Sequence, residues 1–183
     1  AIENFALQGG GAIDNDSLTD DTINIVRGRF VGNHSSGIGD EGGGAILNNA
    51  GDVHAIGTLF ANNHVGGSDI HYNNGGAIYA QTVDLVDSDL IANTSDDTGA
   101  VFASTSITMS GGRLEENSAK TCGGLNAMEV VVERTRFADN TAPFGWGGAI
   151  CAVIADIANG EFSRNTAQVG GGAINALFVT TVN

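Results

Sequence analysis

The sequence predicts an all-β protein, a right-handed parallel β-helix of about seven coils with three short strands in each coil. Three observations favour this fold. Two short elements recur in phase, their period of about 24 residues is too short for two packed helices, and glycine contributes 28 of 183 residues while proline occurs once. The segments between the glycines are rich in β-branched residues and lack helical periodicity.

The first recurring element reads Gly-Gly-Ala-Ile, and its copies begin 23 to 33 residues apart. Five copies are intact and two are degenerate: Gly10–Ile13, Gly43–Ile46, Gly75–Ile78, Thr98–Val101, Cys122–Leu125, Gly147–Ile150 and Gly171–Ile174. The second element is Phe or Leu followed three positions later by Asn: Phe30/Asn33, Phe60/Asn63, Leu90/Asn93, Leu114/Asn117, Phe137/Asn140 and Phe162/Asn165. Stacked coils place equivalent positions of both elements above one another.

Stacking explains the composition of each element. The last position of the first element forms an inward aliphatic column of Ile13, Ile46, Ile78, Val101, Leu125, Ile150 and Ile174. The glycines supply backbone angles that a side chain would forbid at a corner. The Asn column (Asn33, Asn63, Asn93, Asn117, Asn140 and Asn165) is interpreted as a structural ladder, in which each Asn bonds to the next amide and tolerates a left-handed turn.

The chain is predicted to be one β-helix domain over residues 1–183. Residues 1–8 form an N-terminal edge segment, 9–174 hold the repeats, and 175–183 begin an incomplete last coil. Phe5 followed by Gln8 is similar to the element that the last coil lacks. If the C-terminus of one copy met the N-terminus of another, Gly171 and Gly10 would be 22 residues apart, close to one coil. The chain is therefore either an excerpt of a longer β-helix or a subunit that stacks head to tail, with an interface formed by Ile2, Phe5, Leu7, Phe178 and Val182.

Charge excludes several kinds of partner. Seven Lys and Arg against 21 Asp and Glu give a net charge of −14, which disfavours binding to nucleic acid or to an anionic membrane surface. No run of about 18 apolar residues could span a membrane as a helix. The chain starts at Ala1 without a secretion signal, so we expect a processed protein or an excerpt.

The candidate metal ligands have an ordinary alternative explanation. Asp14, Asp16, Asp20 and Asp21 lie in one turn-like segment and are weak calcium candidates, but solvated acidic turns are the favoured explanation. His34 and His64 each follow a ladder Asn, so they should stack, but a third metal ligand is not evident.

The two cysteines are expected to be separate thiols. Cys122 opens its repeat, whereas Cys151 lies four positions past the opening of the next repeat. An offset of four residues along a strand is about 13 Å, which is too far for a disulfide.

An outward column follows the aliphatic one, and Leu47, Tyr79 and Phe102 occupy it on three successive coils. This apolar stripe is either a contact surface or an area covered by the longer segments Ser35–Glu41 and Val65–Asn74. No pair of carboxylates recurs at a spacing that would define a general acid and base, so we expect no enzymatic activity and no catalytic residues.

The paired GGAI and FxxN elements resemble the repeat of the chlamydial polymorphic outer-membrane proteins and related bacterial surface proteins. The resemblance covers Gly9 to Ile174. It implies a right-handed β-helix displayed on a cell surface, often acting in adhesion, and it brings no catalytic residues.

Together these observations predict a non-enzymatic, extracellular or cell-surface structural and adhesive protein that assembles head to tail into a filament. No cofactor is expected, with calcium as an open possibility. The expected partners are further copies of the chain, or a host-surface or glycan ligand. The alternative is a polysaccharide-binding or polysaccharide-cleaving β-helix with an exposed groove, possibly using calcium.

Overall fold

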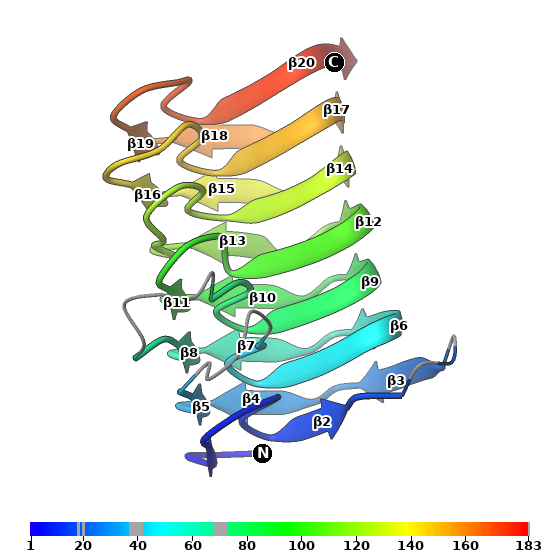
Figure 1. Ribbon diagram of the computed structural model, residues 1–183. Coiled ribbons are helices and arrows are strands. Elements are labelled where there is room, and N and C mark those ends of the chain that lie inside the picture. The colour runs from blue at the N-terminus through cyan, green and yellow to red at the C-terminus, as the bar shows by residue number, and fades with distance from the viewer. Residues whose placement is uncertain (18, 20, 37–41, 68–72, 183) are drawn as a thin grey trace.

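The computed structural model describes residues 1–17, 19, 21–36, 42–67 and 73–182. In this part of the chain the regular elements are β-strands without any helix, and the strands pair in parallel. Successive coils stack along one axis, with the N-terminus at one end and the C-terminal strand at the other (Figure 1). The predicted parallel β-helix is confirmed.

The longest strands form one sheet, and each strand pairs with its counterpart one coil later. In spatial order they are β2 (Ile13–Asn15), β6 (Ile46–Ile56), β9 (Ile78–Val86), β12 (Val101–Ser110), β14 (Leu125–Glu133), β17 (Ile150–Ala158) and β20 (Ile174–Val182). β3 (Thr22–Val26) also pairs with β6, beyond the part of β6 that pairs with β2.

Two further faces complete each coil. The second sheet contains three-residue strands in the order β18 (Glu161–Ser163), β15 (Arg136–Ala138), β13 (Arg113–Glu115), β10 (Asp89–Ile91), β7 (Leu59–Ala61) and β4 (Arg29–Val31). The third face contains two-residue strands, which are β1 (Phe5–Ala6), β5 (His34–Ser35), β8 (His64–Val65), β11 (Thr94–Ser95), β16 (Thr141–Ala142) and β19 (Thr166–Ala167). Single bridges through Ser118 connect the β11 and β16 parts of this face.

The core consists of columns, as predicted. Ile46, Ile78 and Ile150 are fully buried and aligned in register, whereas Ile13 and Ile174 of the end coils are partly buried. The Phe/Leu column lies on the second sheet, and its aromatic members stack, with ring centroids 5.1 Å apart for Phe30–Phe60 and 4.8 Å apart for Phe137–Phe162.

The second glycine of the first element is required mainly by close approach of the next coil. A Cβ on Gly44 would lie 1.9 Å from the carbonyl oxygen of Gly76, and one on Gly148 would lie 2.1 Å from that of Gly172. Neither glycine has a left-handed φ. The expectation that the whole pair is needed for unusual backbone angles is therefore wrong at this position, because the constraint is the space between coils.

The Asn ladder is confirmed, but its left-handed residue is misplaced in the prediction. Among the described residues the ladder Asn have negative φ, and the residue before each of them has φ between 51° and 64°. These left-handed residues are Glu3, Gly32, Asn62, Ala92, Glu116, Asp139 and Arg164. The turn is therefore made one position earlier, and the Asn side chain points into the coil to hold it.

This register identifies one more ladder residue. Asn4 follows the left-handed Glu3, and its backbone and side-chain nitrogens donate to Oδ1 of Asn33 at 3.2 and 2.8 Å. Phe5 pairs with His34 and not with a Phe of the second element. The similarity of Phe5 and Gln8 to the missing element is therefore misleading, because Ala1 occupies the Phe position.

Candidate functional site

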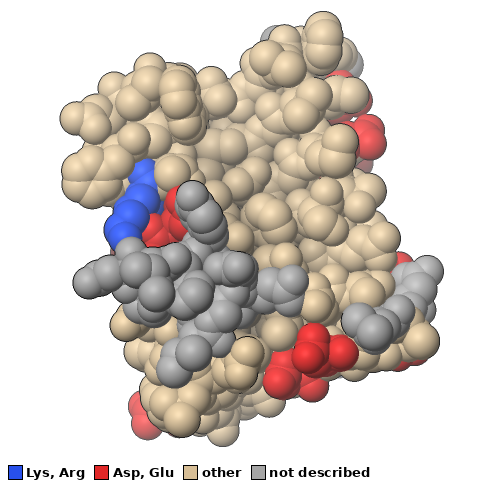
Figure 2. Space-filling model, viewed as in Figure 1, with Lys and Arg blue, Asp and Glu red and all other residues tan. Residues whose placement is uncertain are grey.

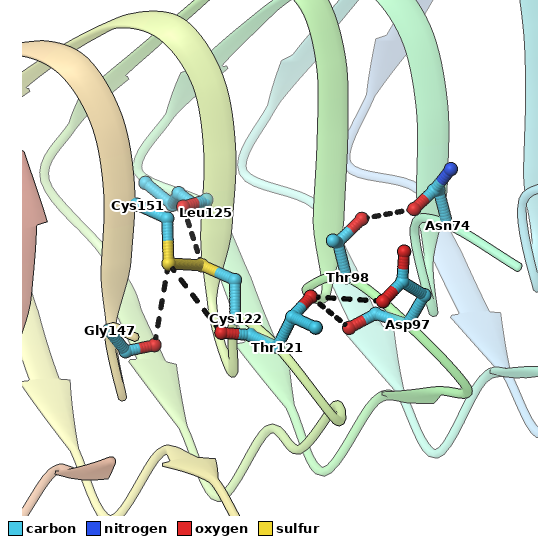
Figure 3. Close-up of a disulfide and its surroundings, with 8 residues drawn as sticks. All are labelled: Asn74, Asp97, Thr98, Thr121, Cys122, Leu125, Gly147 and Cys151. Atoms are coloured by element: carbon cyan, nitrogen blue, oxygen red, sulfur yellow. Dashed lines mark hydrogen bonds between the residues drawn. A yellow bond between two sulfur atoms is a disulfide. The ribbon is translucent and has the colours of Figure 1, made fainter. Parts of the chain in front are cut away.

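A disulfide joins Cys122 to Cys151 at the corner that leads into the long strands (Figure 3). The expectation of two separate thiols is wrong. Cys122 pairs with Gly147 before the corner, and the chain then turns into β17, so the four residues from Gly147 to Cys151 run around the corner and not along a strand. The two Cα atoms are consequently 6.0 Å apart, a normal separation for a disulfide.

At the equivalent corners of the preceding coils, hydrogen bonds connect one coil to the next. The Thr121 hydroxyl donates to the carbonyl oxygen of Asp97 at 2.7 Å and contacts its carboxylate at 3.1 Å, and Thr98 bonds to Asn74 on the preceding coils (Figure 3). These bonds and the disulfide link Asn74 to Cys151 across successive coils. The corner is therefore a rigid part of the surface.

A groove of about 380 Å³ opens beside the disulfide, which is within the size range of small-molecule sites. It lies over the first residues of β12, β14 and β17. None of its lining residues carries a charge; they are Phe102, Ala103, Ser104, Thr121, Cys122, Asn126, Ala127, Met128, Trp146, Cys151, Ala152, Val153 and Asn175. Figure 2 shows that the face over the long strands is largely free of charged side chains.

Trp146 is the residue of this groove that the sequence analysis missed. It lies between β16 and β17 and is 52% exposed, and the nearby Phe144 is 68% exposed without lining the groove. Neither residue belongs to a repeated element. The sequence feature that could have pointed to this site is the single Trp of the chain, which lies close to the single Pro, Pro143.

The predicted apolar stripe is only partly a surface. Leu47, Tyr79 and Phe102 pair in register, as expected. Leu47 is 4% exposed, so it is not an available binding residue. Tyr79 and Phe102 are half-buried and stack with ring centroids 5.0 Å apart, and of the three only Phe102 lines the groove. Residues 37–41 and 68–72 of the two longer segments lie outside the described residues.

The predicted stacking of His34 and His64 is confirmed. Their rings meet edge to face with centroids 4.9 Å apart, Phe5 contacts His34 on the other side, and Nδ1 of His64 lies 2.8 Å from the Thr94 hydroxyl. Burial and then the neighbouring His34 lower the pKa of His64, against smaller opposing effects of Asp96 and Thr94. His64 therefore favours the neutral imidazole.

The weak calcium candidates do not converge in the described residues. Asp16 accepts a hydrogen bond from Asn49, and the carboxylate of Asp21 accepts one from Thr19, while Asp20 lies outside the described residues. Where residues are described, no group of three His, Cys, Asp or Glu side chains could hold a metal ion. The calcium site stays a prediction.

The proposed end residues belong to different faces. Ile2, Phe5 and Leu7 are exposed at the N-terminal end. Phe178 pairs with Ile154 in an outward column, whereas Val179 continues the buried column of Ala155 and Val130 and is 49% exposed at the open end. Val182 pairs with Ala158. Val179, which the sequence analysis omitted, is the better candidate, because alternation along the strand points its side chain into the coil.

Comparison with protein families assigns the repeats. Residues 57–81 and 159–177 match the model of the Chlamydia polymorphic membrane protein repeat. Two segments of the chain are therefore similar to this repeat. Each match includes one Phe/Asn pair of the ladder and one Gly-Gly-Ala-Ile element, so the family signature coincides with the residues that build the coil.

Polymorphic membrane proteins are surface-exposed proteins of the outer membrane, and the repeats assign this chain coarsely to a cell surface. Searches of curated proteins and of solved structures gave no match. Within the described residues, no helix is long and apolar enough to cross a membrane. The Cys122–Cys151 disulfide agrees with an oxidising environment outside the cytoplasm.

Proposed function

We propose that this polymorphic membrane protein repeat chain is a non-enzymatic structural and adhesive module of the cell surface, whose copies join end to end into a filament. The observation that carries the proposal is the polarity of the Asn ladder. Each ladder Asn donates its backbone N–H and its amide N–H to Oδ1 of the Asn one coil later, as Asn63 does to Asn93 at 3.0 and 2.9 Å.

The two ends of this ladder are complementary. In the described part of the chain, Nδ2 of Asn165 donates back to the carbonyl oxygen of Phe137, and no side chain accepts from its backbone N–H. At the other end, Asn4 donates to Asn33, and its own Oδ1 accepts no hydrogen bond from a described residue. Asn4 of a second copy above Asn165 would supply the acceptor that the ladder lacks.

The same placement continues the aliphatic columns. Ile13 occupies the column of Ile174, and Ile23 occupies the column of Val179. Both columns are fully buried or nearly so in the middle coils and partly open at the ends. β2 and β3 of one copy pairing with β20 of another would bury them and satisfy the open strand edge. Such a heterologous contact does not close, so it generates filaments.

The absence of catalysis is part of the same proposal. Acidic side chains on the second sheet are engaged in ion pairs: Glu115 with Arg113 and Arg136, and Asp139 with Arg164 at 2.6 Å. The hydrogen bond with Arg164 lowers the pKa of Asp139, so this carboxylate stays ionised and is poorly suited to act as a general acid.

The experiment compares Val179→Lys with Thr180→Lys in the 183-residue chain. Lys at position 179 places a charge in the inward column of the open end, whereas Thr180 is the next residue on the outward side and pairs with Asp156. Analytical ultracentrifugation and negative-stain electron microscopy should find rods that lengthen with concentration for wild type and Thr180→Lys, and monomers for Val179→Lys. A wild-type chain that stays monomeric at high concentration would reject the filament.

A further inference from the structure

The groove beside the Cys122–Cys151 disulfide presents flat apolar surfaces. Trp146 is half exposed there, and Phe102 is backed by Tyr79, whose ring stacks on it at 5.0 Å. Met128 adds a third apolar side chain that is largely exposed. Aromatic plates at a surface bury the C–H faces of a ring-shaped ligand while its polar edge stays hydrated.

Neutral polar groups are placed between these surfaces. Asn126 and Asn175 occupy the same outward column, on either side of Cys151, so their side chains are separated by two coils, or about 10 Å. Ser104 and Thr121 add hydroxyl groups to the lining. Amide and hydroxyl side chains each donate and accept hydrogen bonds, as the hydroxyl groups of a ligand require.

Charge narrows the class of ligand. The groove contains no charged lining residue in a chain with a net charge of −14. The overall field repels an anionic ligand, and a cationic ligand would find no carboxylate in the lining. The site therefore fits an uncharged ligand that combines apolar ring faces with many hydroxyl groups.

The groove is also pre-organised. The disulfide fixes Cys151 against Cys122, and parallel pairing in register holds Phe102, Asn126 and Asn175 on the neighbouring strands. A rigid site loses little conformational entropy on binding. We infer that this groove is a binding site for an uncharged oligosaccharide.

The test uses the single Trp of the chain as its reporter. The 183-residue protein is titrated with cellotetraose, maltotetraose and tetra-N-acetylchitotetraose, and with tetragalacturonate as the anionic probe, while Trp146 fluorescence is recorded. At least one uncharged probe should cause a saturable change, and tetragalacturonate should not. The inference is overturned if no uncharged probe changes the fluorescence saturably, which is the result expected if the groove instead receives a protein side chain. It is also overturned if tetragalacturonate binds as well as the uncharged probes.

Two variants localise the binding. Phe102→Ala retains the Trp reporter and should weaken binding about tenfold, because a stacking surface is lost. Asn175→Ala, on the last coil, should weaken it about fivefold through loss of a hydrogen bond. Phe144→Ala is the matched control, since Phe144 is exposed nearby but lies outside the lining. Equal affinity of Phe144→Ala, Phe102→Ala and Asn175→Ala would place the ligand elsewhere and reject the inference.

Discussion

Asn63 bonds to Asn93 twice, through its side-chain amide at 2.9 Å and through its backbone N–H at 3.0 Å, and both bonds end on the same oxygen atom. The amide of Asn93 in turn donates to the carbonyl oxygen of Phe60 and to Asn117. Both Asn residues are fully buried. One side chain therefore satisfies backbone groups of the turn, and it also connects one coil to the next.

Asn93→Ala should destabilise the fold by about 3 kcal/mol or more, because both N–H donors of Asn63 lose their acceptor in the core and the amide bonds to Phe60 and Asn117 are lost. Urea unfolding followed by circular dichroism measures this loss. Asn49→Ala is the matched control, since among the described residues the Asn49 side chain makes a single surface hydrogen bond, to Asp16, and its loss should change stability by at most about 0.5 kcal/mol. Equal losses in the two variants would contradict a structural role of the ladder.

The disulfide should contribute about 3–4 kcal/mol to stability, because it closes a loop between residues 29 positions apart. Reduction with dithiothreitol, or the double variant Cys122→Ala/Cys151→Ala, should lower the free energy of unfolding by this amount while the β-sheet spectrum is retained. Dithiothreitol should have no further effect on the double variant. A reductant effect of equal size in that variant would show that the loss has another cause.

Ala→Gly should have opposite effects at two positions of one coil, Ala92 and Ala80. Ala92 has a φ of 52°, which is strained for any residue with a Cβ, so Ala92→Gly should stabilise the protein by up to about 1 kcal/mol. Ala80 is buried in β9. Ala80→Gly removes the packing of its methyl group and raises the entropy of the unfolded chain, so it should destabilise the protein by about 1 kcal/mol. Thermal unfolding of both variants tests the assignment of the left-handed corner. The assignment would be wrong if the melting temperature shifted in the same direction in both variants.

The repeated features could be predicted from the sequence because each column is sampled on almost every coil. Ile46 and Asn93 are recognisable as members of a series, and the series determines the coil length and the inward face. Features that occur once could not be predicted in this way. The Cys122–Cys151 bond depends on how the chain turns at Gly147, and the groove depends on Trp146, which has no counterpart on another coil.

The two errors at the chain ends have a related cause. Asn4 is the ladder residue of the first coil, but Ala1 stands where the second element elsewhere has Phe or Leu. The sequence pattern therefore favoured Phe5 and Gln8. Val179 does not stand out among the apolar residues of the last strand, and only its alternation along β20, in register with Ala155, identifies it as inward. A hidden polar column was missed as well: the buried hydroxyl groups of Thr58 and Ser88 accept from backbone N–H groups of Gly28 and Thr58 at the corner after the long strand.

Protonation of His64 should destabilise the fold. Burial and the neighbouring His34 lower the pKa of His64 in the folded state below its usual value of about 6.5, so the unfolded chain binds more protons in the window between the two values. Stability is therefore fully present above about pH 6.5 and decreases as the pH falls through this window. The charge of Asp96 and a backbone hydrogen bond with Thr94 oppose this lowering of the pKa without reversing it. Urea unfolding of wild type and His64→Gln between pH 7.5 and about 5 should give a steeper decline for wild type. Parallel curves for the two proteins would exclude His64 as the source of the pH dependence.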